Sequence, residues 1–298
     1  MWLLLALLGH LLNAFVYITD KAFVVKFYPN PKALAFISGA VGAFTFLLFP
    51  WFLKWAPPDV ILAGIGSGLI SIPALVYFFV AIQRDEISRV VPAVGSMVPL
   101  FTFGLSYWIL LERLGDKPIA TFGLLALGGL LIASRSFKSV FQRGLHSLLL
   151  LEIFVAFLFA LSFVLQKYAF EGTEDFSAFL WSRVGTVAAA VPLLFSADVR
   201  AKIKLSEFSG SGFKMGVFYA ASRIFAGLSP LVILLAISFG SVSLVNSLQG
   251  IQYALLFLLA ILFSRRWPDI FKEEITRGVI IQKSIATALI IIGLALLV

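Results

Sequence analysis

The chain has 298 residues, of which 61% are hydrophobic and only 13% are charged. A soluble globular domain is about 45–50% apolar and about 25% charged, so this composition excludes an ordinary soluble domain and predicts a polytopic helical membrane protein. A β-barrel is also excluded, because the apolar residues form runs of about 20 residues instead of short alternating segments. There is no cysteine, which excludes disulfides, thiolate metal sites and cysteine nucleophiles.

Ten apolar runs, separated by charged, proline or glycine clusters, predict ten membrane-spanning helices. They cover residues 2–20, 33–53, 60–82, 89–111, 118–134, 147–167, 177–196, 213–237, 241–263 and 279–298. Only the stretch SFGS separates the eighth run from the ninth. The first run lacks a basic region and a small-residue cleavage site, so we expect a retained helix instead of a cleaved signal peptide.

The fourth run contains two prolines, Pro92 and Pro99. Proline lacks the backbone N–H and bends a helix. In a bilayer, the carbonyls that it frees must be satisfied by neighbouring helices or by a water-filled cavity. This helix is therefore expected to be bent and to lie inside the bundle, beside something polar.

The two halves of the chain resemble each other. The first run ends in ITDKAF and the sixth in LQKYAF, which makes Lys21 and Lys167 equivalent. Gly95 in the fourth run recurs as Gly250 in the ninth, at an offset of 155. Each half, 1–143 and 144–298, holds five runs, and an odd number means that the second half enters the membrane upside down. We therefore expect two inverted five-helix repeats, as in many secondary transporters, with a site near mid-membrane between them.

With these repeats, the chain resembles the drug/metabolite transporter (DMT) superfamily, in its ten-helix EamA-like branch. The likeness rests on the two helix ends above, on the passages Phe78–Pro99 and Ile233–Ser264, and on the Leu-Glu-Arg-Leu turn that begins at Leu111. The family usually has glycine where Leu111 stands. The resemblance implies alternating access around a cavity lined mainly by helices one to four and six to nine, with helices five and ten supporting it.

Charged residues inside an apolar run require a reason, because each costs about 2.5–3.5 kcal/mol at mid-membrane. Arg223 lies ten residues into the eighth run, about 15 Å from its start. Its guanidinium would clamp a carboxylate or phosphate of a substrate, form an internal ion pair, or cap the carbonyls of a bent helix. Arg183, about two turns into the seventh run, either binds substrate or snorkels to the interface. Glu152, about one turn into the sixth run, would pair with an arginine, carry a proton or reach the headgroups.

Three amide side chains share a face of the ninth run, because Asn246, Gln249 and Gln252 recur every three residues. Amides both donate and accept, which suits a neutral or zwitterionic solute. They also bind helices to one another, and both interpretations stay open. His10 is expected to be a packed histidine instead of a ligand, and no metal or other cofactor is expected.

The first run carries a second polar face, on which Asn13, Tyr17, Asp20 and Lys21 follow the spacing i, i+4, i+7 and i+8. Asp20 beside Lys21 would form a proton-responsive pair, which would allow proton coupling. Because Lys21 and Lys167 end their helices, anchoring at the membrane interface is the alternative for both.

Arg89 stands at the mouth of the fourth run, with Asp85 and Glu86 just before it. An ion pair there would serve as a gate. Enzyme motifs are missing from the sequence: there is no HExxH, no aspartate-rich cluster and no P-loop lysine, and the only histidines are His10 and His146. The protein is therefore not expected to be an enzyme.

The net charge of +8 is expected to lie in cytoplasmic loops, and no nucleic acid is expected as a partner. Loops after odd-numbered runs hold 17 of the 23 Lys and Arg residues, and loops after even-numbered runs hold 4. The positive-inside rule then places the odd-numbered loops in the cytoplasm and both termini outside it. The ten-helix relatives are generally drawn with both termini in the cytoplasm.

The sequence thus predicts an all-α integral protein of the plasma (inner) membrane. Its expected function is secondary-active transport of a small polar metabolite, amino acid-like or another small organic solute, by alternating access. A lipid-carrier flippase and a non-transporting membrane scaffold are the alternatives. The expected partners are the solute and membrane lipids, and the oligomeric state stays open.

Overall fold

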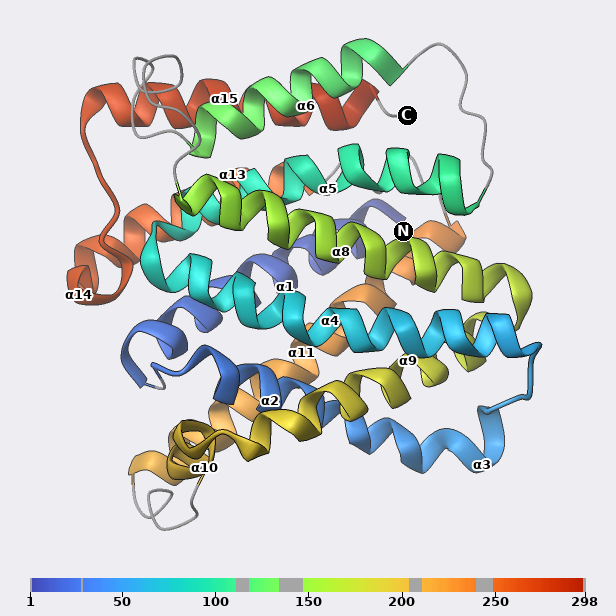
Figure 1. The fold of residues 1–298 in the computed structure, drawn as a ribbon. Helices are drawn as coiled ribbons and strands as arrows, with labels where there is room; N and C mark the ends of the chain where they lie inside the picture. The colour runs from blue at the N-terminus through green and yellow to red at the C-terminus, as the bar shows by residue number, and fades with distance from the viewer. Residues whose placement is uncertain are drawn as a thin grey trace.

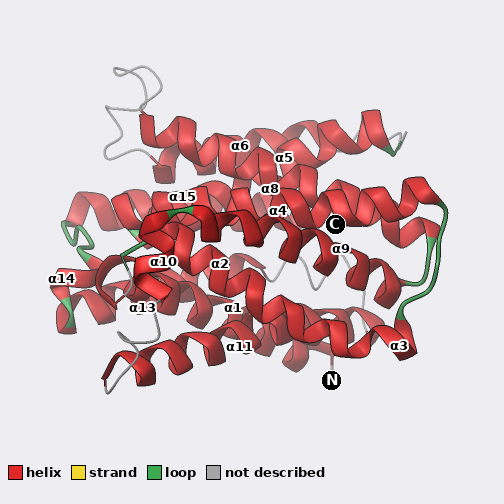
Figure 2. Ribbon diagram, turned by 60° about the horizontal axis from the view of Figure 1, so that its bottom comes forward, coloured by secondary structure: helices red, strands yellow, loops and turns green. Residues whose placement is uncertain are grey.

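The computed structural model describes residues 2–27, 29–110, 118–133, 147–203, 211–239 and 249–296. These residues are almost entirely helical and include no strand (Figure 2). The long helices run roughly alongside one another in a single bundle (Figure 1). The expected all-α class is therefore confirmed for the described part of the chain.

The helices follow the expected runs along the chain. The first half contains α1 (Trp2–Ala22) with a π-helical turn (Phe23–Phe27), α2 (Pro31–Gly42) with a 3-10 turn (Ala43–Leu48), α3 (Phe49–Phe52), α4 (Pro58–Arg84), α5 (Ile87–Ile109) and α6 (Pro118–Ala133). The second half contains α8 (Ser147–Gly172), α9 (Asp175–Ala190) with a 3-10 turn (Val191–Phe195), α10 (Ala197–Ile203), α11 (Ser211–Phe239), α13 (Gln249–Arg266), α14 (Pro268–Phe271) and α15 (Arg277–Leu296).

Six helical segments of the described chain are long and apolar enough to cross a membrane. They are Trp2–Phe27, Pro31–Phe52, Pro58–Arg84, Ile87–Ile109, Ser147–Gly172 and Asp175–Phe195. The other four expected runs fall on the helices α6, α11, α13 and α15. That all ten segments cross the bilayer, as two inverted repeats, stays a prediction.

Local sequence signals explain where α2 begins. The side chain of Asn30 accepts a hydrogen bond from the Ala33 N–H at 3.0 Å, and Pro31 occupies the first helical turn. Asparagine at this position satisfies an N–H that has no partner within the helix. Proline fits the first turn because its missing N–H would have no intrahelical partner anyway.

Two glycines let α4 and α9 cross with their backbones in contact. A Cβ added at Gly68 would overlap the carbonyl oxygen of Ser182, and one added at Gly185 would overlap the carbonyl oxygen of Ile65. Small residues allow this close approach between membrane helices. A side chain at either glycine would therefore force the two helices apart.

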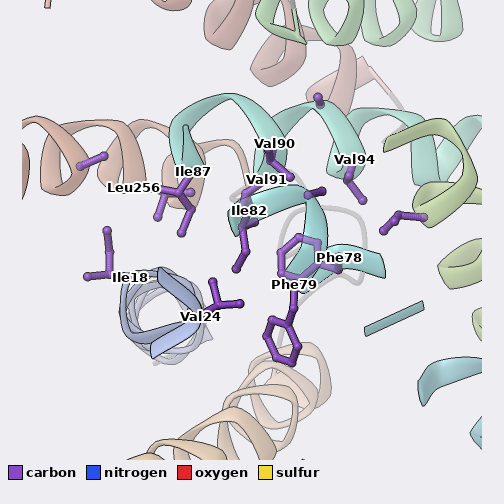
Figure 3. Packing of buried hydrophobic residues seen from close by; sticks show 14 of the residues in the cluster. Ile18, Val24, Phe78, Phe79, Ile82, Ile87, Val90, Val91, Val94 and Leu256 are labelled. Carbon is purple, nitrogen blue, oxygen red and sulfur yellow. The ribbon is translucent and has the colours of Figure 1, made fainter. Parts of the chain in front are cut away.

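The start of α5 lies at the centre of the hydrophobic core. All eight residues from Ile87 to Val94 are buried, as expected for a helix that is surrounded by protein on every side. Figure 3 shows side chains of α5 packed against those of the first spanning segment (Trp2–Phe27), α4 and α13. They include Ile18, Phe78, Phe79, Ile82 and Leu256. The expectation that this helix lies inside the bundle holds for its first half, whereas Tyr107 and Trp108 near its end are exposed. Both prolines lie within the helix.

The bundle has two ends and one distinct edge. α1 begins and α15 ends at the end where α3 lies, and α14 lies at the opposite end (Figure 1). We call these the α3 end and the α14 end. α6 and α15 pack against each other along one edge of the bundle.

Candidate functional site

Arg223 of α11 forms a buried ion pair with Asp20 of α1. Their side chains are only 6% and 3% exposed. The ring of Tyr219, one turn earlier on α11, lies 4.6 Å from the guanidinium carbon, and Ser222 Oγ accepts from Arg223 Nε at 3.4 Å. Of the interpretations open for Arg223, the structure thus forms the internal ion pair.

The two members of the ion pair lie at different distances from the ends of their helices. Asp20 is seven residues before Phe27, which ends the first spanning segment, and this corresponds to about 10 Å along the helix. Arg223 lies twelve residues after Ser211, the start of α11, which corresponds to about 18 Å along that helix, and its expected place near mid-membrane stays a prediction. The expected partnership of Asp20 with Lys21 is replaced by the pair with Arg223.

Aromatic rings surround this ion pair. The ring centroids of Phe23 and Tyr219 are 4.6 Å apart, and the Tyr219 hydroxyl lies 3.5 Å from Ser38 Oγ on α2. Half-buried Tyr17 lies within electrostatic reach of Asp20. Surroundings of this kind exclude water, and the attraction between two charges is stronger there than at a surface.

Tyr253 of α13 lies directly against Gly95 of α5. A Cβ added at Gly95 would overlap the Tyr253 hydroxyl. This hydroxyl is buried and has no hydrogen-bond partner among the described residues. Pro99 lacks the N–H that would otherwise bond to the Gly95 carbonyl. The expected fourth and ninth helices therefore meet at polar groups whose hydrogen-bonding capacity is not used within the helices.

Gln252 is the one member of the amide face whose side chain the structure describes. Asn246 and the side chain of Gln249 lie outside the described residues. Gln252 is buried, and its Oε1 lies 3.3 Å from His10 Nδ1 on α1. The sequence prediction of a packed histidine at position 10 agrees with this contact. Asn13, on the same helix, is half-buried.

A second group of charged side chains lies at the α14 end, around Lys283 of α15. Its Nζ pairs with Glu86, and also lies 2.8 Å from Glu273 Oε2 and 2.7 Å from Ser88 Oγ. Ser88 Oγ in turn donates to Glu273 Oε2 at 2.5 Å. The side chain of Lys283 is only 1% exposed, so its charge is compensated within the protein and not by water.

Arg89 belongs to the same group and is also only 1% exposed. Its Nε donates to Glu86 Oε2 at 3.1 Å, and its Nη2 lies 3.5 Å from Glu274 Oε2. The expected ion pair at the mouth of the fourth helix is thus formed with Glu86. We call the six side chains Glu86, Ser88, Arg89, Glu273, Glu274 and Lys283 the Lys283 network. It joins the first half of the chain to the second.

The pKa values of two carboxyls in this network move in opposite directions. Burial raises the pKa of Glu273, although Lys283 opposes the change. Burial also acts to raise the pKa of Glu86, but Lys283 and Arg89 outweigh it and hold that pKa below its usual value. Two carboxyls on one lysine therefore differ in how readily they accept a proton.

Lys21 lies inside the protein and does not anchor the membrane interface. Its side chain is buried, and its Nζ donates to the carbonyl oxygens of Ile82 at 2.5 Å and Asp85 at 2.7 Å. The last carbonyls of a helix lack intrahelical donors and carry partial negative charge. A cation from α1 is therefore the C-terminal cap of α4, which corrects the anchoring interpretation for this residue.

Lys167 and Glu152 have contrasting surroundings on α8. Lys167 is 45% exposed and lies 3.7 Å from Glu171, one turn later. Glu152 is buried, within electrostatic reach of Asp85 and Arg89. Glu152 is thus enclosed by protein, and the interpretations that it pairs with an arginine or carries a proton stay open.

Arg183 is half-buried at the contact between α9 and α2. Its guanidinium carbon lies 4.6 Å from the ring of Phe179, and its Cδ lies 3.8 Å from where a Cβ on Gly42 would be. Its Nε has no hydrogen-bond partner among the described residues. Arg183 thus lies away from the ion pair of Arg223, in contact with an aromatic ring.

Sequence reasoning missed Lys283, Glu273 and Tyr253. The charge count places Lys283 with the loop residues, although the tenth run begins before it, with VII preceding it and IATALIII following it within two residues. This apolar context on both sides was the available signal that the lysine lies within a helix. Glu273 and Tyr253 had no comparable signal, because their partners are distant in the chain. No group of three His, Cys, Asp or Glu that could hold a metal ion occurs within the described ranges.

Comparison with known proteins gives a likeness in fold. No family model matches the chain, and no curated protein matches it. Eleven chains of solved structures match. One of them, described as "Crystal structure of protein", has a TM-score of 0.55 and 20% sequence identity, and the match covers 99% of this chain and 95% of that chain. The two chains are therefore similar in fold over almost the full length of each.

Proposed function

We propose that this protein is a secondary-active transporter that moves a small polar solute by alternating access between two inverted repeats, like the DMT superfamily that its sequence resembles. The observation that carries the proposal is the buried ion pair of Asp20 and Arg223, which connects α1 to α11 inside an apolar bundle. Ionisable residues within a membrane are costly and mark solute or ion pathways.

The helix contacts support two equivalent repeats. If α1 and α8 are counterparts, and likewise α4 and α11, then the contact of α1 with α11 should recur as α8 with α4, and it does. In the same way α1 contacts α13, and α8 contacts α5. The counterparts α2 and α9 pack on each other, as do α6 and α15. Contacts that persist when the halves are exchanged are what a two-fold relation between repeats produces.

The ion pair suits a site that alternates between an empty and an occupied state. Without solute, Asp20 and Arg223 satisfy each other, so neither charge is left unpaired in the bundle. A solute with a carboxylate or phosphate would compete for the guanidinium, which binds such groups through two parallel hydrogen bonds. Gln252 and the hydroxyl of Tyr253, from the second half, would supply neutral contacts.

Uptake by reconstituted protein tests the proposal. Proteoliposomes would be offered a panel of labelled amino acids, organic acids and other small metabolites, with a proton gradient or with unlabelled solute inside. We expect saturable uptake of at least one solute, and its loss in Asp20→Asn and Arg223→Gln. Lys54→Gln is the control, because it removes an exposed ion pair with Glu174 at the α3 end and should leave uptake unchanged.

If no solute of the panel enters vesicles that hold correctly inserted, monodisperse protein, transport of small solutes is refuted.

Lipid flipping is the second candidate function, and one observation favours it. An apolar groove lined by Ala40, Ala43, Phe44, Phe46 and Leu47 lies on the segment that Arg183 contacts. In that case, the protein would move a fluorescent phospholipid between leaflets, and Arg183→Gln would slow the movement.

A further inference from the structure

The Lys283 network ties together the parts of the chain that must separate if the α14 end opens. Lys283 and Glu273 belong to the second half, whereas Glu86, Ser88 and Arg89 belong to the first. Glu273 is also fixed within its own half, because its backbone N–H donates to Ser264 Oγ at 3.2 Å. A solute passing between the halves at this end would have to break these contacts.

The cap that Lys21 places on α4 extends the connection to a third helix. Lys21 binds the carbonyl oxygens of Ile82 and Asp85, immediately before the turn that carries Glu86. The end of α1, the turn between α4 and α5, and the start of α15 are therefore connected through one set of buried charges. Movement of α15 relative to α5 would therefore be transmitted through these contacts to α1, which carries Asp20.

We propose that the Lys283 network is a gate at the α14 end, and that closing this gate takes up one proton, which Glu273 holds. The gate has this use only if the protein transports, as proposed above. The structure corresponds to the closed state, because Lys283, Arg89 and Glu273 are all buried.

Two carboxyls of the network are placed to share one proton. Glu86 and Glu273 both bind the ammonium of Lys283, and they lie within hydrogen-bonding reach of each other. Lys21 of α1 also lies within electrostatic reach of Glu273. The other charged groups that reach members of this set are Asp85, Arg89, Glu152, Lys272 and Glu274. A proton on Glu273 would remove the repulsion between the two carboxylates.

The direction of the pH effect follows from burial. Burial raises the pKa of Glu273 in the closed gate, and contact with water in an open gate would bring it back towards its usual value. The closed gate therefore binds the proton more tightly, so lowering the pH favours closing and raising it favours opening. Glu86, whose pKa is held low by Lys283 and Arg89, stays ionised and keeps Lys283 in place.

A gate built from charges can open at moderate cost. Removing charged groups from water is unfavourable, and pairing them offsets this only in part. When the halves separate, water replaces the lost partners of Lys283 and Glu273. A purely apolar seal would gain no such compensation when it became wet.

Thiol labelling tests the gate without any knowledge of the solute. The chain has no cysteine, so Ile270→Cys introduces a single thiol, at a position that is only 4% exposed beside Glu273. Ile275→Cys, at a position that is 39% exposed in the same connection, is the reference. A membrane-impermeant maleimide is applied to vesicles whose α14 end faces the reagent, between about pH 5.5 and about pH 8.5. Burial raises the pKa of a thiol, so a rise of this ratio with pH indicates opening only where it exceeds the rise in the Glu273→Gln chain, which carries the same two thiols.

We expect this ratio to rise several-fold with pH in the otherwise unchanged chain. Glu273→Gln, which mimics the protonated side chain, should give a low ratio that rises much less with pH. Glu174→Gln is the matched control, because it makes the same change at an exposed glutamate at the α3 end. A ratio that is flat with pH, or a Glu273→Gln variant that retains the pH dependence, would overturn the gate.

The thiol-labelling experiment and the uptake experiment can fail independently of each other. If labelling responds as expected and no solute is carried, closure by a proton stands and transport does not. If solute is carried and labelling does not respond to pH, transport stands and the gate does not.

Discussion

Asp20 and Arg223 lie 203 residues apart in the sequence and form a buried ion pair between α1 and α11. At the residue scale, pairing decides whether such charges stabilise or destabilise the fold. Removing one partner leaves the other charge buried without compensation, whereas removing both leaves no charge to compensate. The same reasoning applies to Lys283 with its two carboxylates.

This asymmetry predicts the stability of three variants. Asp20→Asn and Arg223→Met should each lower the free energy of unfolding by about 3–5 kcal/mol, because each leaves a buried charge unpaired. The double variant should be more stable than either single one. Thermal unfolding in detergent measures all three, with Lys54→Gln as an exposed control that should change little. Additive losses in the double variant would show that the two side chains do not interact.

At the scale of the helices, the sequence predicted the place of a helix in the bundle better than it predicted the contacts of single side chains. Pro92 and Pro99 in an apolar run predicted a helix enclosed by others, and the start of α5 is buried on all sides. The side chains that pack against α5 could not be predicted in the same way, because Tyr253, which lies against Gly95, belongs to the other half of the chain. Spacing within one run shows which residues share a face, but not which helix covers that face.

The crossing of α4 and α9 gives a prediction at this scale. Gly68→Leu or Gly185→Leu should prevent the two backbones from touching and strongly lower the yield of folded protein. Gly104→Ala is the control, because a Cβ at Gly104 meets nothing within 4 Å. Alanine in a helix interior is favoured over glycine by about 0.5–1 kcal/mol, so this variant should be no less stable than the parent. Size-exclusion chromatography and thermal unfolding in detergent would compare them.

At the scale of the whole molecule, the regular features of the sequence were predicted well and the charged exceptions were not. Long apolar runs predicted helices in the right places, since period and length are local properties. For Lys21 and Lys283 the sequence predicts a loop or interface position, because a lysine at the edge of an apolar run usually faces water. Their burial depends on partners elsewhere in the chain, such as the carbonyl of Ile82 and the carboxylate of Glu273.

The burial of these basic residues also affects the prediction of how the molecule is oriented in the membrane. Of the 17 basic residues assigned to loops after odd-numbered runs, Lys21, Arg89 and Lys283 are buried and bonded inside the protein. Buried cations cannot interact with lipid headgroups, so the remaining 14, against 4 in the other loops, should determine the orientation. Those of the 14 that lie within the described residues belong to helix ends and connections at the α14 end, which is therefore predicted to face the cytoplasm.

An orientation set in this way predicts the location of both termini. A reporter that is active only outside the cytoplasm should be active when fused after Val298. An impermeant thiol reagent added to intact cells should fail to label Ile275→Cys until the membrane is opened. Lys283→Met should leave this pattern unchanged, because the charge that it removes is held by Glu86 and Glu273 and not by the membrane. Activity of a cytoplasm-only reporter at Val298, together with labelling of Ile275→Cys in intact cells, would reverse the assignment and place the Lys283 network at the outer face.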